Sequence, residues 1–288
     1  MLTPAAEVDI DEVLVAQLIR AQHPDLAGRP LTLVANGWDN AIYRLGEDLC
    51  VRMPRRKVAV ELIVNEQRWL PELAANVATP IPVPLRQGVP QFGYPWPWTV
   101  TRWFTGRVAV DLPPAQRTPI AAQLGDFMAG WHVPAPAEAP RSPVRGIPLP
   151  QRDPGVRSGL ASGNVPHAEA LEALWDRLVA TAAWPGPPVW LHGDPHPANM
   201  LIDDGGLVAV LDFGDLNAGD PATDLAAGWL VFDADAREVF RSHAAPDADT
   251  WARAHGWAIA LGIAFQLHSD DNPMMAAIAT HTLGQVLL

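Results

Sequence analysis

Three polar residues late in the chain have the types and spacing of a phosphoryl-transfer site. The string LHGDPHPANMLID at 191–203 contains Asp194 and Asn199, and the string AVLDFGD at 209–215 contains Asp212. A carboxylate can accept a proton from an attacking hydroxyl, and Mg²⁺ takes few protein oxygens because substrate phosphates and water supply the rest. The pattern predicts Asp194 as the catalytic base, with Asn199 and Asp212 holding Mg²⁺ against nucleotide phosphates.

A compact β-unit should position these three groups. Apolar runs around a turn rich in Asp and Gly predict strands at 188–192, 199–202 and 207–212, with the turn at 203–206. Two prolines stiffen the loop between the first two strands. We therefore expect the catalytic aspartate, the asparagine and the second aspartate to meet at one edge of a small sheet.

Neighbouring residues are expected to support this loop. His192 and His196 have a spacing that suits zinc only on a helix, and the prolines at 195 and 197 argue against a helix here. His192 is interpreted as a structural hydrogen-bonding residue, whereas His196 either lines the site or is solvated. Asp220 before a proline predicts a helix N-cap, and Asp224 is expected to accept hydrogen bonds from the loop backbone.

The rest of the chain divides into a β-rich part and a helical part. Before residue 104, hydrophobic periodicity predicts helices at 8–20 and 58–70, strands at 31–35, 41–45 and 49–53, and a β-rich run at 98–104. Beyond it, the pattern predicts helices at 118–132 and 167–183, an irregular proline-rich segment at 133–157, and two or three helices after the β-unit.

Bulk properties exclude several classes of protein. The net charge of −12 argues against a general nucleic-acid binder, and no apolar run reaches the roughly 18 residues of a membrane span. A single cysteine, Cys50, excludes an intrachain disulfide framework and a cysteine-based zinc site. The acidic start lacks the features of a signal peptide, so the expected compartment is the cytoplasm.

The charge is distributed unevenly along the chain. Residues 1–103 carry 11 acids and 10 bases, whereas residues 104–288 carry 21 acids and 10 bases. Within 194–271 there are 14 acids and three bases. Such a half would attract a cationic substrate, although an acidic, solubilising surface is an equally good interpretation.

The ordered motifs HGDPHPAN, DFG and GDPATDLA resemble those of the aminoglycoside phosphotransferase and choline-kinase-like family, whose fold is similar to that of protein kinases. The resemblance extends from the NGWDN turn at 36–40 to about residue 232. It implies an α+β, two-lobed fold, with a small β-rich nucleotide-binding lobe at 1–103 and a larger, mainly helical lobe for catalysis and substrate binding at 104–288. It also implies the base, metal and loop-support roles assigned above.

A lobe of this kind needs a cation on its third strand to clamp phosphates. The one lysine, Lys57, lies beyond the strand, whereas Arg52 lies inside it, and some members of the family use arginine there. Arg52 is permanently charged and binds phosphate or carboxylate oxygens in a fork. Glu66, on the apolar face of the helix at 58–70, is the expected carboxylate partner.

Other nucleotide contacts are predicted by position. The NGWDN turn replaces the glycine-rich loop of protein kinases, and Gly37 is its one permissive residue. The hinge, whose backbone groups would read the purine, is expected near Arg102, Trp103 and Phe104.

These residues predict a small-molecule kinase that transfers the γ-phosphate of ATP or GTP to a hydroxyl, with Mg²⁺ as cofactor. An HRD string, a GxGxxG loop and an APE-like segment are absent, which argues against a protein kinase. A non-catalytic nucleotide-binding module is the alternative class, and the presence of all three active-site groups argues against it. We expect a small hydroxylated molecule as partner, with no nucleic acid and no membrane. The choice of nucleotide and the oligomeric state stay open.

The sequence also leaves the acceptor open. Aminoglycosides are polycations that suit an acidic lobe, and the candidate ammonium partners are Asp215, Asp233, Asp235, Glu238, Asp270 and Asp271. Macrolides carry one amine and need an apolar cleft, for which the tryptophans at 229, 251 and 257 are candidates. An endogenous hydroxylated metabolite or sugar is as compatible with the sequence as either antibiotic. The family resemblance favours an antibiotic-type acceptor, which is an argument from association alone.

Overall fold

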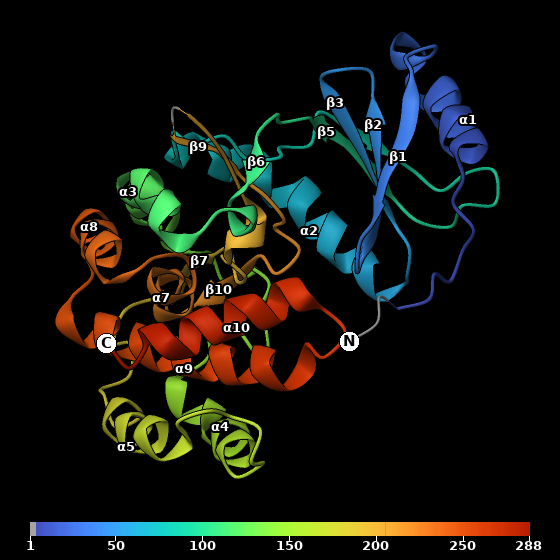
Figure 1. The fold of residues 1–288 in the computed structure, drawn as a ribbon. Helices are drawn as coiled ribbons and strands as arrows, with labels where there is room; N and C mark the ends of the chain where they lie inside the picture. Colours follow the sequence, from blue (N-terminus) through green and yellow to red (C-terminus); the bar gives the residue numbers. More distant parts are fainter. Residues whose placement is uncertain (1–3, 205) are drawn as a thin grey trace.

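The computed structural model describes residues 4–204 and 206–288, and its N-terminal part is built on a five-stranded antiparallel sheet (Figure 1). The strands lie in the order β1–β2–β3–β5–β4, with bounds β1 (Leu31–Asn36), β2 (Asn40–Leu45), β3 (Leu49–Pro54), β4 (Arg86–Gly88) and β5 (Trp98–Arg102). Along β2, Ala41, Tyr43 and Leu45 are buried, as the period of two in a strand requires. The predicted strands are therefore present, although the run at 98–104 ends as a strand at residue 102.

Two helices flank this sheet. Helix α1 (Glu12–Gln22) packs its buried face against the sheet core, and α2 (Val58–Leu73) lies between the sheet and the helical part of the chain (Figure 1). The prediction that the first helix begins at residue 8 is wrong, because Asp11 caps the helix by accepting the N–H of Leu14 at 2.8 Å. The apolar residues before Asp11 still pack on the core as an extended segment.

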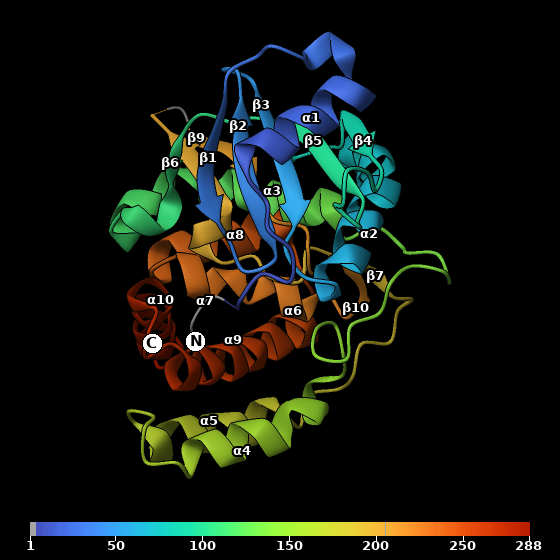
Figure 2. The same ribbon diagram turned by 90° about the vertical axis from the view of Figure 1, so that its right-hand side faces the viewer.

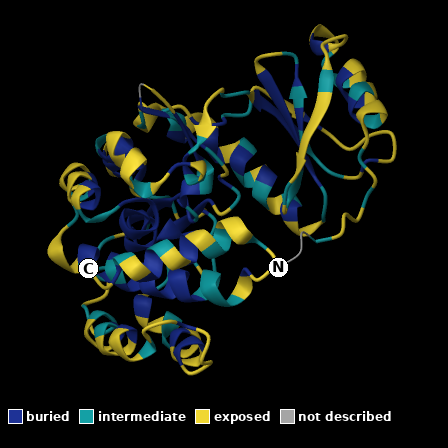
Figure 3. Ribbon diagram, viewed as in Figure 1, coloured by how far each residue is buried: buried dark blue, intermediate teal, exposed yellow. Residues whose placement is uncertain are grey.

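The C-terminal part is mainly helical. Its helices are α3 (Ala121–Trp131), α4 (Asp153–Leu160), α5 (Ala168–Leu178), α6 (Ala222–Leu225), α7 (Ala227–Val231), α8 (Ala234–Ala244), α9 (Ala248–His268) and α10 (Pro273–Gln285). Figure 3 shows α9 as the most deeply buried of the long helices, and its residues from Trp257 to Ile263 are all buried. A helix that is apolar on all sides belongs in a core. Helices α4 and α5 lie together below α9 (Figure 2).

A small β-unit is formed by the chain between α5 and α6, together with a short strand that precedes α3. Strand β7 (Val189–Leu191) pairs with β10 (Asn217–Gly219), and β8 (Met200–Asp203) lies between β6 (Arg107–Val108) and β9 (Gly206–Val210). The predicted turn at 203–206 includes residue 205, which lies outside the described residues. The loop with the HGD motif thus joins β7 to β8, and the DFG motif follows β9.

Several helix boundaries differ from prediction. The segment 133–157 is not irregular throughout, since a 3-10 turn at 149–152 leads into α4, which begins at Asp153. Proline is tolerated in the first turn of a helix, so Pro150 and Pro154 start these helices rather than break them. Residues 114–120 form a 3-10 helix before α3, α5 ends at residue 178, and α2 runs on to residue 73. After the β-unit the described chain forms five helices, because the short α6 and α7 precede the three longer ones.

No helix within residues 4–204 and 206–288 has the length and apolar character needed to cross a membrane.

A buried ion pair ties α9 to the corner between β10 and α6. The Arg253 Nε donates to Asp220 Oδ2 at 2.7 Å, and both side chains are almost fully buried. Asp220 Oδ1 also accepts the N–H of Ala222 at 3.0 Å, although α6 begins at Ala222, so that its N-cap is Pro221 and not the predicted Asp220. The pair therefore fixes the start of the GDPATDLA segment against the central helix.

Replacing Asp220 with alanine should lower the free energy of unfolding by about 3 to 5 kcal/mol, because it leaves the Arg253 charge buried without its partner. The control is Asp25→Ala, which removes the exposed pair between Asp25 and Arg86 and should cost less than about 1 kcal/mol. Urea unfolding of both variants measures the difference. Equal losses in the two variants would contradict the importance given to the buried pair.

Candidate active site

The backbone of the HGD loop is held by a buried carboxylate. Asp224, on α6, has no solvent exposure. Its Oδ2 accepts the N–H of His192 at 2.7 Å and its Oδ1 accepts the N–H of Gly193 at 2.9 Å. The His132 Nε2 lies 3.2 Å from the same carboxylate. These are the contacts with the loop backbone that the sequence led us to expect of Asp224.

The first two residues of the motif shape the loop. The His192 Nε2 donates to the carbonyl of Leu211 at 2.8 Å, and its Nδ1 accepts the N–H of Asp194 at 3.2 Å. His192 is thus a fully buried structural residue. Gly193 has a φ of +90°, and a Cβ atom there would lie 2.3 Å from the carbonyl oxygen of Asp215. Only glycine allows both this backbone conformation and this close approach.

Two basic side chains flank the carboxylate of Asp194. The His196 Nε2 lies 3.2 Å from Oδ2, and the Arg145 Nη2 lies 3.4 Å from Oδ1. Burial by itself raises the pKa of Asp194, but His196, then Arg145 and His192, outweigh it and hold that pKa well below its ordinary value. Burial likewise lowers the pKa of His196, and the Asp194 carboxylate more than offsets this, so that pKa is raised. Asp194 is therefore an ionised acceptor that the side chains of His196 and Arg145 orient.

Asn199 and Asp212 are brought together by the β-unit. The backbone carbonyl of Asn199 accepts the N–H of Leu211 at 2.8 Å, which places the two residues on adjacent chain segments. The Asn199 Nδ2 donates to the backbone carbonyl of Asp194 at 2.9 Å, so its side-chain oxygen is the atom suited to a cation. Asp212 has a φ of +58° and an exposed side chain. Non-glycine residues in this conformation cluster at functional sites.

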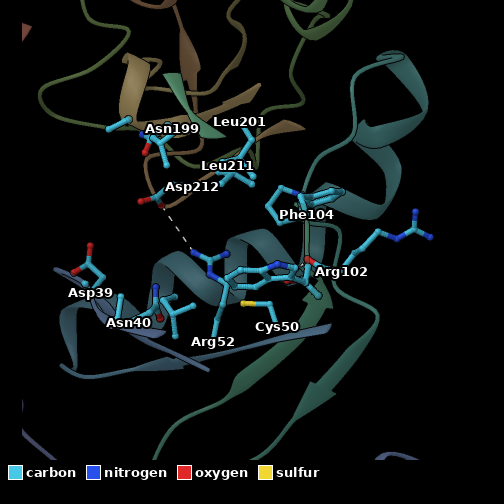
Figure 4. A pocket seen from close by; sticks show the side chains of 18 of the residues that line it. Asp39, Asn40, Cys50, Arg52, Arg102, Phe104, Asn199, Leu201, Leu211 and Asp212 are labelled. Atoms are coloured by element: carbon cyan, nitrogen blue, oxygen red, sulfur yellow. Dashed lines mark hydrogen bonds and ion pairs between the residues drawn. The ribbon is translucent and has the colours of Figure 1, made fainter. Parts of the chain in front are cut away.

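A cavity of about 510 Å³ lies between the sheet and the β-unit (Figure 4). Seven of the residues predicted for the site line it, namely Gly37, Arg52, Arg102, Trp103, Phe104, Asn199 and Asp212. Further lining residues, not predicted, are mostly apolar and suit the flat ring of a purine; they include Ile42, Cys50, Pro82, Leu201 and Leu211. Two oxygen-bearing side chains at one end of such a cavity fit Mg²⁺, which keeps most of its coordination for water and phosphates.

Arg52 reaches into this cavity from β3. Its Nη1 pairs with Glu66 on α2, and both side chains are buried. Its Nη2 lies 3.9 Å from Asp212 Oδ1, the contact drawn as a dashed line in Figure 4. Burial lowers the pKa of Arg52, but Glu66 and then Asp212 outweigh this and raise it, so the guanidinium stays charged. Lys57 is exposed and does not line the cavity.

The NGWDN turn is held by two arginines that the sequence did not single out. The Arg55 Nη1 donates to the carbonyl of Gly37 at 2.7 Å, and the Arg56 Nη2 pairs with Asp39 at 2.8 Å. Both follow β3 directly, so their charge could have suggested a role close to the turn. Arg145 gave no such signal, because it comes from the proline-rich segment far from any motif.

The acidic residues predicted to bind substrate are spread over the helical part. Asp215 lies at the HGD loop, where its backbone carbonyl faces Gly193. Asp270 and Asp271 lie in the turn after α9, and Phe265 near that end of α9 contacts the His196 ring at a centroid distance of 6.3 Å.

Three predicted carboxylates belong to α8 or its N-cap and do not line the cavity; they are the N-cap residue Asp233 and, on the helix, Asp235 and Glu238. Figure 1 shows α8 beyond α3, on the side of the helical part away from the sheet. Asp233 caps α8 by accepting the N–H of Ala236, and Glu238 pairs with Arg241 on the same helix.

The three tryptophans considered for an apolar substrate cleft are core residues instead. Trp229, Trp251 and Trp257 are buried and belong to the main hydrophobic cluster. Trp229 lies against Trp251 at a centroid distance of 4.5 Å. Their apolar area is used to pack α7 and α9, and the prediction that they line a cleft is wrong.

The sequence model of one protein family, described as the phosphotransferase enzyme family, matches residues 30–257. The chain belongs to this family. The matched range contains the NGWDN turn, the HGD and DFG motifs and the first half of the central helix α9, up to Trp257. The enzyme class expected from the sequence, a phosphotransferase with an alcohol group as acceptor, is confirmed.

Solved structures of phosphotransferases share this fold. A GDP complex of aminoglycoside 2'-phosphotransferase-IIIa is similar with a TM-score of 0.68 and 17% identity, over 96% of this chain and 99% of that one. The macrolide 2'-phosphotransferase MphH from Brachybacterium faecium is similar with a TM-score of 0.66 and 22% identity, over 93% and 97%. At these identities the likeness establishes the fold, and the predicted α+β, kinase-like class is confirmed.

One relative is similar in sequence. The uncharacterized protein YcbJ of Bacillus subtilis (strain 168) is 27% identical over 201 residues, which span 63% of this chain and 62% of that relative. The match therefore covers less than two thirds of the length of YcbJ.

The contact between Asp194 and His196 makes stability dependent on pH. Because the pKa of Asp194 is lowered, its contribution is present above about pH 3.9 and lost as the pH falls through the folded-state value. Because the pKa of His196 is raised, its contribution is complete below about pH 6.5 and lost as the pH rises through the folded-state value. The pair should therefore stabilise this phosphotransferase most between these two limits.

Replacing His196 with glutamine should consequently reduce the thermal midpoint more at pH 6 than at pH 9. A matched control is His243→Gln, which removes the exposed contact with Asp126 and should have a small effect at both values. Equal losses for His196→Gln at pH 6 and pH 9 would show that the pair does not titrate in this way.

Proposed function

We propose that this phosphotransferase transfers the γ-phosphate of ATP or GTP to a hydroxyl group of a small molecule. The observation that carries the proposal is the convergence of Arg52, Asn199 and Asp212 on one cavity between the sheet and the β-unit, with Asp194 on the adjoining loop. Residues 1–103 are then the nucleotide-binding lobe, and residues 104–288 are the lobe for catalysis and acceptor binding.

The nucleotide is proposed to lie in the cavity with its base on the apolar residues near Trp103 and Phe104. Arg52, held in place by Glu66, would contact the phosphates, and Gly37 allows the turn above them to approach closely. Several of the similar structures are nucleotide complexes, one with GDP and another with ATP. They support a nucleotide as donor for this chain and leave the choice of base to experiment.

Asn199 and Asp212 are proposed to hold Mg²⁺, which would neutralise charge on the transferred phosphate. Asp194 would orient the acceptor hydroxyl toward the phosphorus and accept its proton. A carboxylate with a strongly lowered pKa is a weak base. Asp194 therefore acts mainly by placing the hydroxyl, which suits a loose transition state in which the proton leaves late.

For the acceptor, we propose an aminoglycoside-type molecule before a macrolide. Asp215 lies beside the HGD loop, so a cationic group on the acceptor would find a carboxylate next to its hydroxyl. The three tryptophans are buried in the core, so they do not form the apolar cleft that a macrolide would need. The similar structures include both kinds of enzyme, one in complex with kanamycin and another a macrolide 2'-phosphotransferase.

A panel of acceptors tests the proposal. ATP and GTP consumption by the purified protein should rise with at least one aminoglycoside such as kanamycin, streptomycin or gentamicin, compared with macrolides, sugars and small alcohols. Turnover with only a macrolide, sugar or alcohol would retain the kinase and reject the aminoglycoside. No turnover of any hydroxyl compound would reject the proposed reaction.

Asp194→Asn should lower turnover by a factor of about 100 or more and leave nucleotide affinity nearly unchanged, because the group acts on the acceptor. Arg52→Met is the matched variant on the donor side and should weaken nucleotide binding. Measuring turnover reports the effect on the reaction, and calorimetric titration with ATP or GTP reports the effect on nucleotide binding. An active Asp194→Asn enzyme would show that another group positions the acceptor.

A further inference from the structure

The proline-rich segment between α3 and α4 is fastened to the lobe beneath the HGD loop. The backbone carbonyl of Pro140 accepts the N–H of Ala218 at 2.9 Å, and the carbonyl of Gly146 accepts the N–H of Asp220 at 2.9 Å. The N–H of Gly146 donates to Thr223 Oγ1 at 2.9 Å. Residues 140–146, which we call the strap, therefore lie alongside β10 and the start of α6 and are bonded to both.

The close packing of Gly146 keeps this strap in place. Its φ is +65°, and a Cβ atom there would lie 2.6 Å from the Leu191 side chain and 3.0 Å from Gly219 Cα. Conversely, a Cβ atom on Gly219 would lie 2.2 Å from the Gly146 carbonyl oxygen. Two glycines in mutual contact leave the segment little freedom to shift along β7 and β10.

The residue before Gly146 makes two contacts with the loop at once. The Arg145 Nε donates to the carbonyl of Gly193 at 2.8 Å, and its Nη2 donates to Asp194 Oδ1 at 3.4 Å. The side chain is only 16% exposed. The fork geometry of a guanidinium allows one side chain to bind a backbone group and the adjacent carboxylate together.

The other oxygen of Asp194 is bound on the opposite side. His196 lies against Oδ2, while Arg145 is the one side chain of the described chain seen to bind Oδ1. With one oxygen held, the carboxylate can still turn about its side-chain bonds. With both oxygens held, its plane and direction are fixed relative to the cavity.

We propose that Arg145 is a positioning residue for phosphoryl transfer, and that the segment 140–146 exists in part to present it to the loop. This inference rests on the proposed function of Asp194. It assigns a role in the active site to a segment that lies about fifty residues before the motif. Misplacing a reacting group by about 1 Å costs on the order of 100-fold in rate, so the effect should be large.

Arg145→Ala should lower the turnover number on the order of 100-fold and change the KM for ATP or GTP less than about threefold. Arg145→Lys should recover part of the loss, because an ammonium keeps a positive charge near Asp194 but lacks the rigid fork that binds the Gly193 carbonyl and the carboxylate together. The assay uses the acceptor that the panel identifies, or water as the acceptor in nucleotide hydrolysis. Thermal midpoints and nucleotide titration confirm that each variant is folded.

The matched control is Arg141→Ala, on the same strap, whose side chain donates to the backbone carbonyl of Ala218 and does not contact the loop. Wild-type turnover in Arg145→Ala, or equal losses in Arg141→Ala and Arg145→Ala, would overturn the inference. The two proposals fail separately. An active Asp194→Asn enzyme rejects the proposed base, whereas an inactive Asp194→Asn with a fully active Arg145→Ala rejects only the role of Arg145.

Discussion

The proposed active site depends on one buried carboxylate that accepts two consecutive backbone N–H groups. Asp224 has no contact with water, and it binds the amides of His192 and Gly193, directly before Asp194. A buried acceptor of this kind is costly unless it is satisfied, so loop and helix hold each other in one arrangement. This contact sets the backbone of the loop just before Asp194, and the contacts of His196 and Arg145 then orient the Asp194 carboxylate.

A second constraint links the sheet to the loop. Arg52 is bound to Glu66 within the N-terminal part and lies near Asp212 on the other side of the cavity. Both groups proposed to bind the phosphate end of a nucleotide thus face one another across the same space. Because Arg52 is buried and paired, it needs little reorganisation to act on a phosphate, which is the advantage of a preorganised cation.

The sequence predicted the parts of the site that local patterns encode. The motifs located Asp194, Asn199, Asp212 and Asp224, and strand alternation distinguished Arg52 from Lys57. It could not predict Arg145, since only tertiary packing brings the segment 140–146 beneath the loop.

The errors have the same origin. The prolines at 133–157 were interpreted as ending regular structure, although two of them lie in the first turn of a helix. The carboxylates of α8 were predicted to bind substrate because their charge does not reveal which face of the helix they occupy. The tryptophans were placed in a cleft by composition, whereas the burial of α7 and α9 placed them in the core. Strand positions were predicted well because a period of two is a local signal, and helix ends were predicted less well because caps depend on single side chains.

Hydrogen exchange in Asp224→Asn tests the central claim most directly. An asparagine keeps the size of the side chain but offers one oxygen, so one of the two amides loses its acceptor. We predict faster exchange in the segment 191–199 together with a loss of turnover, while Asp233→Asn, which alters a helix cap on α8, leaves that segment unchanged. Wild-type exchange and wild-type turnover in Asp224→Asn would contradict the account.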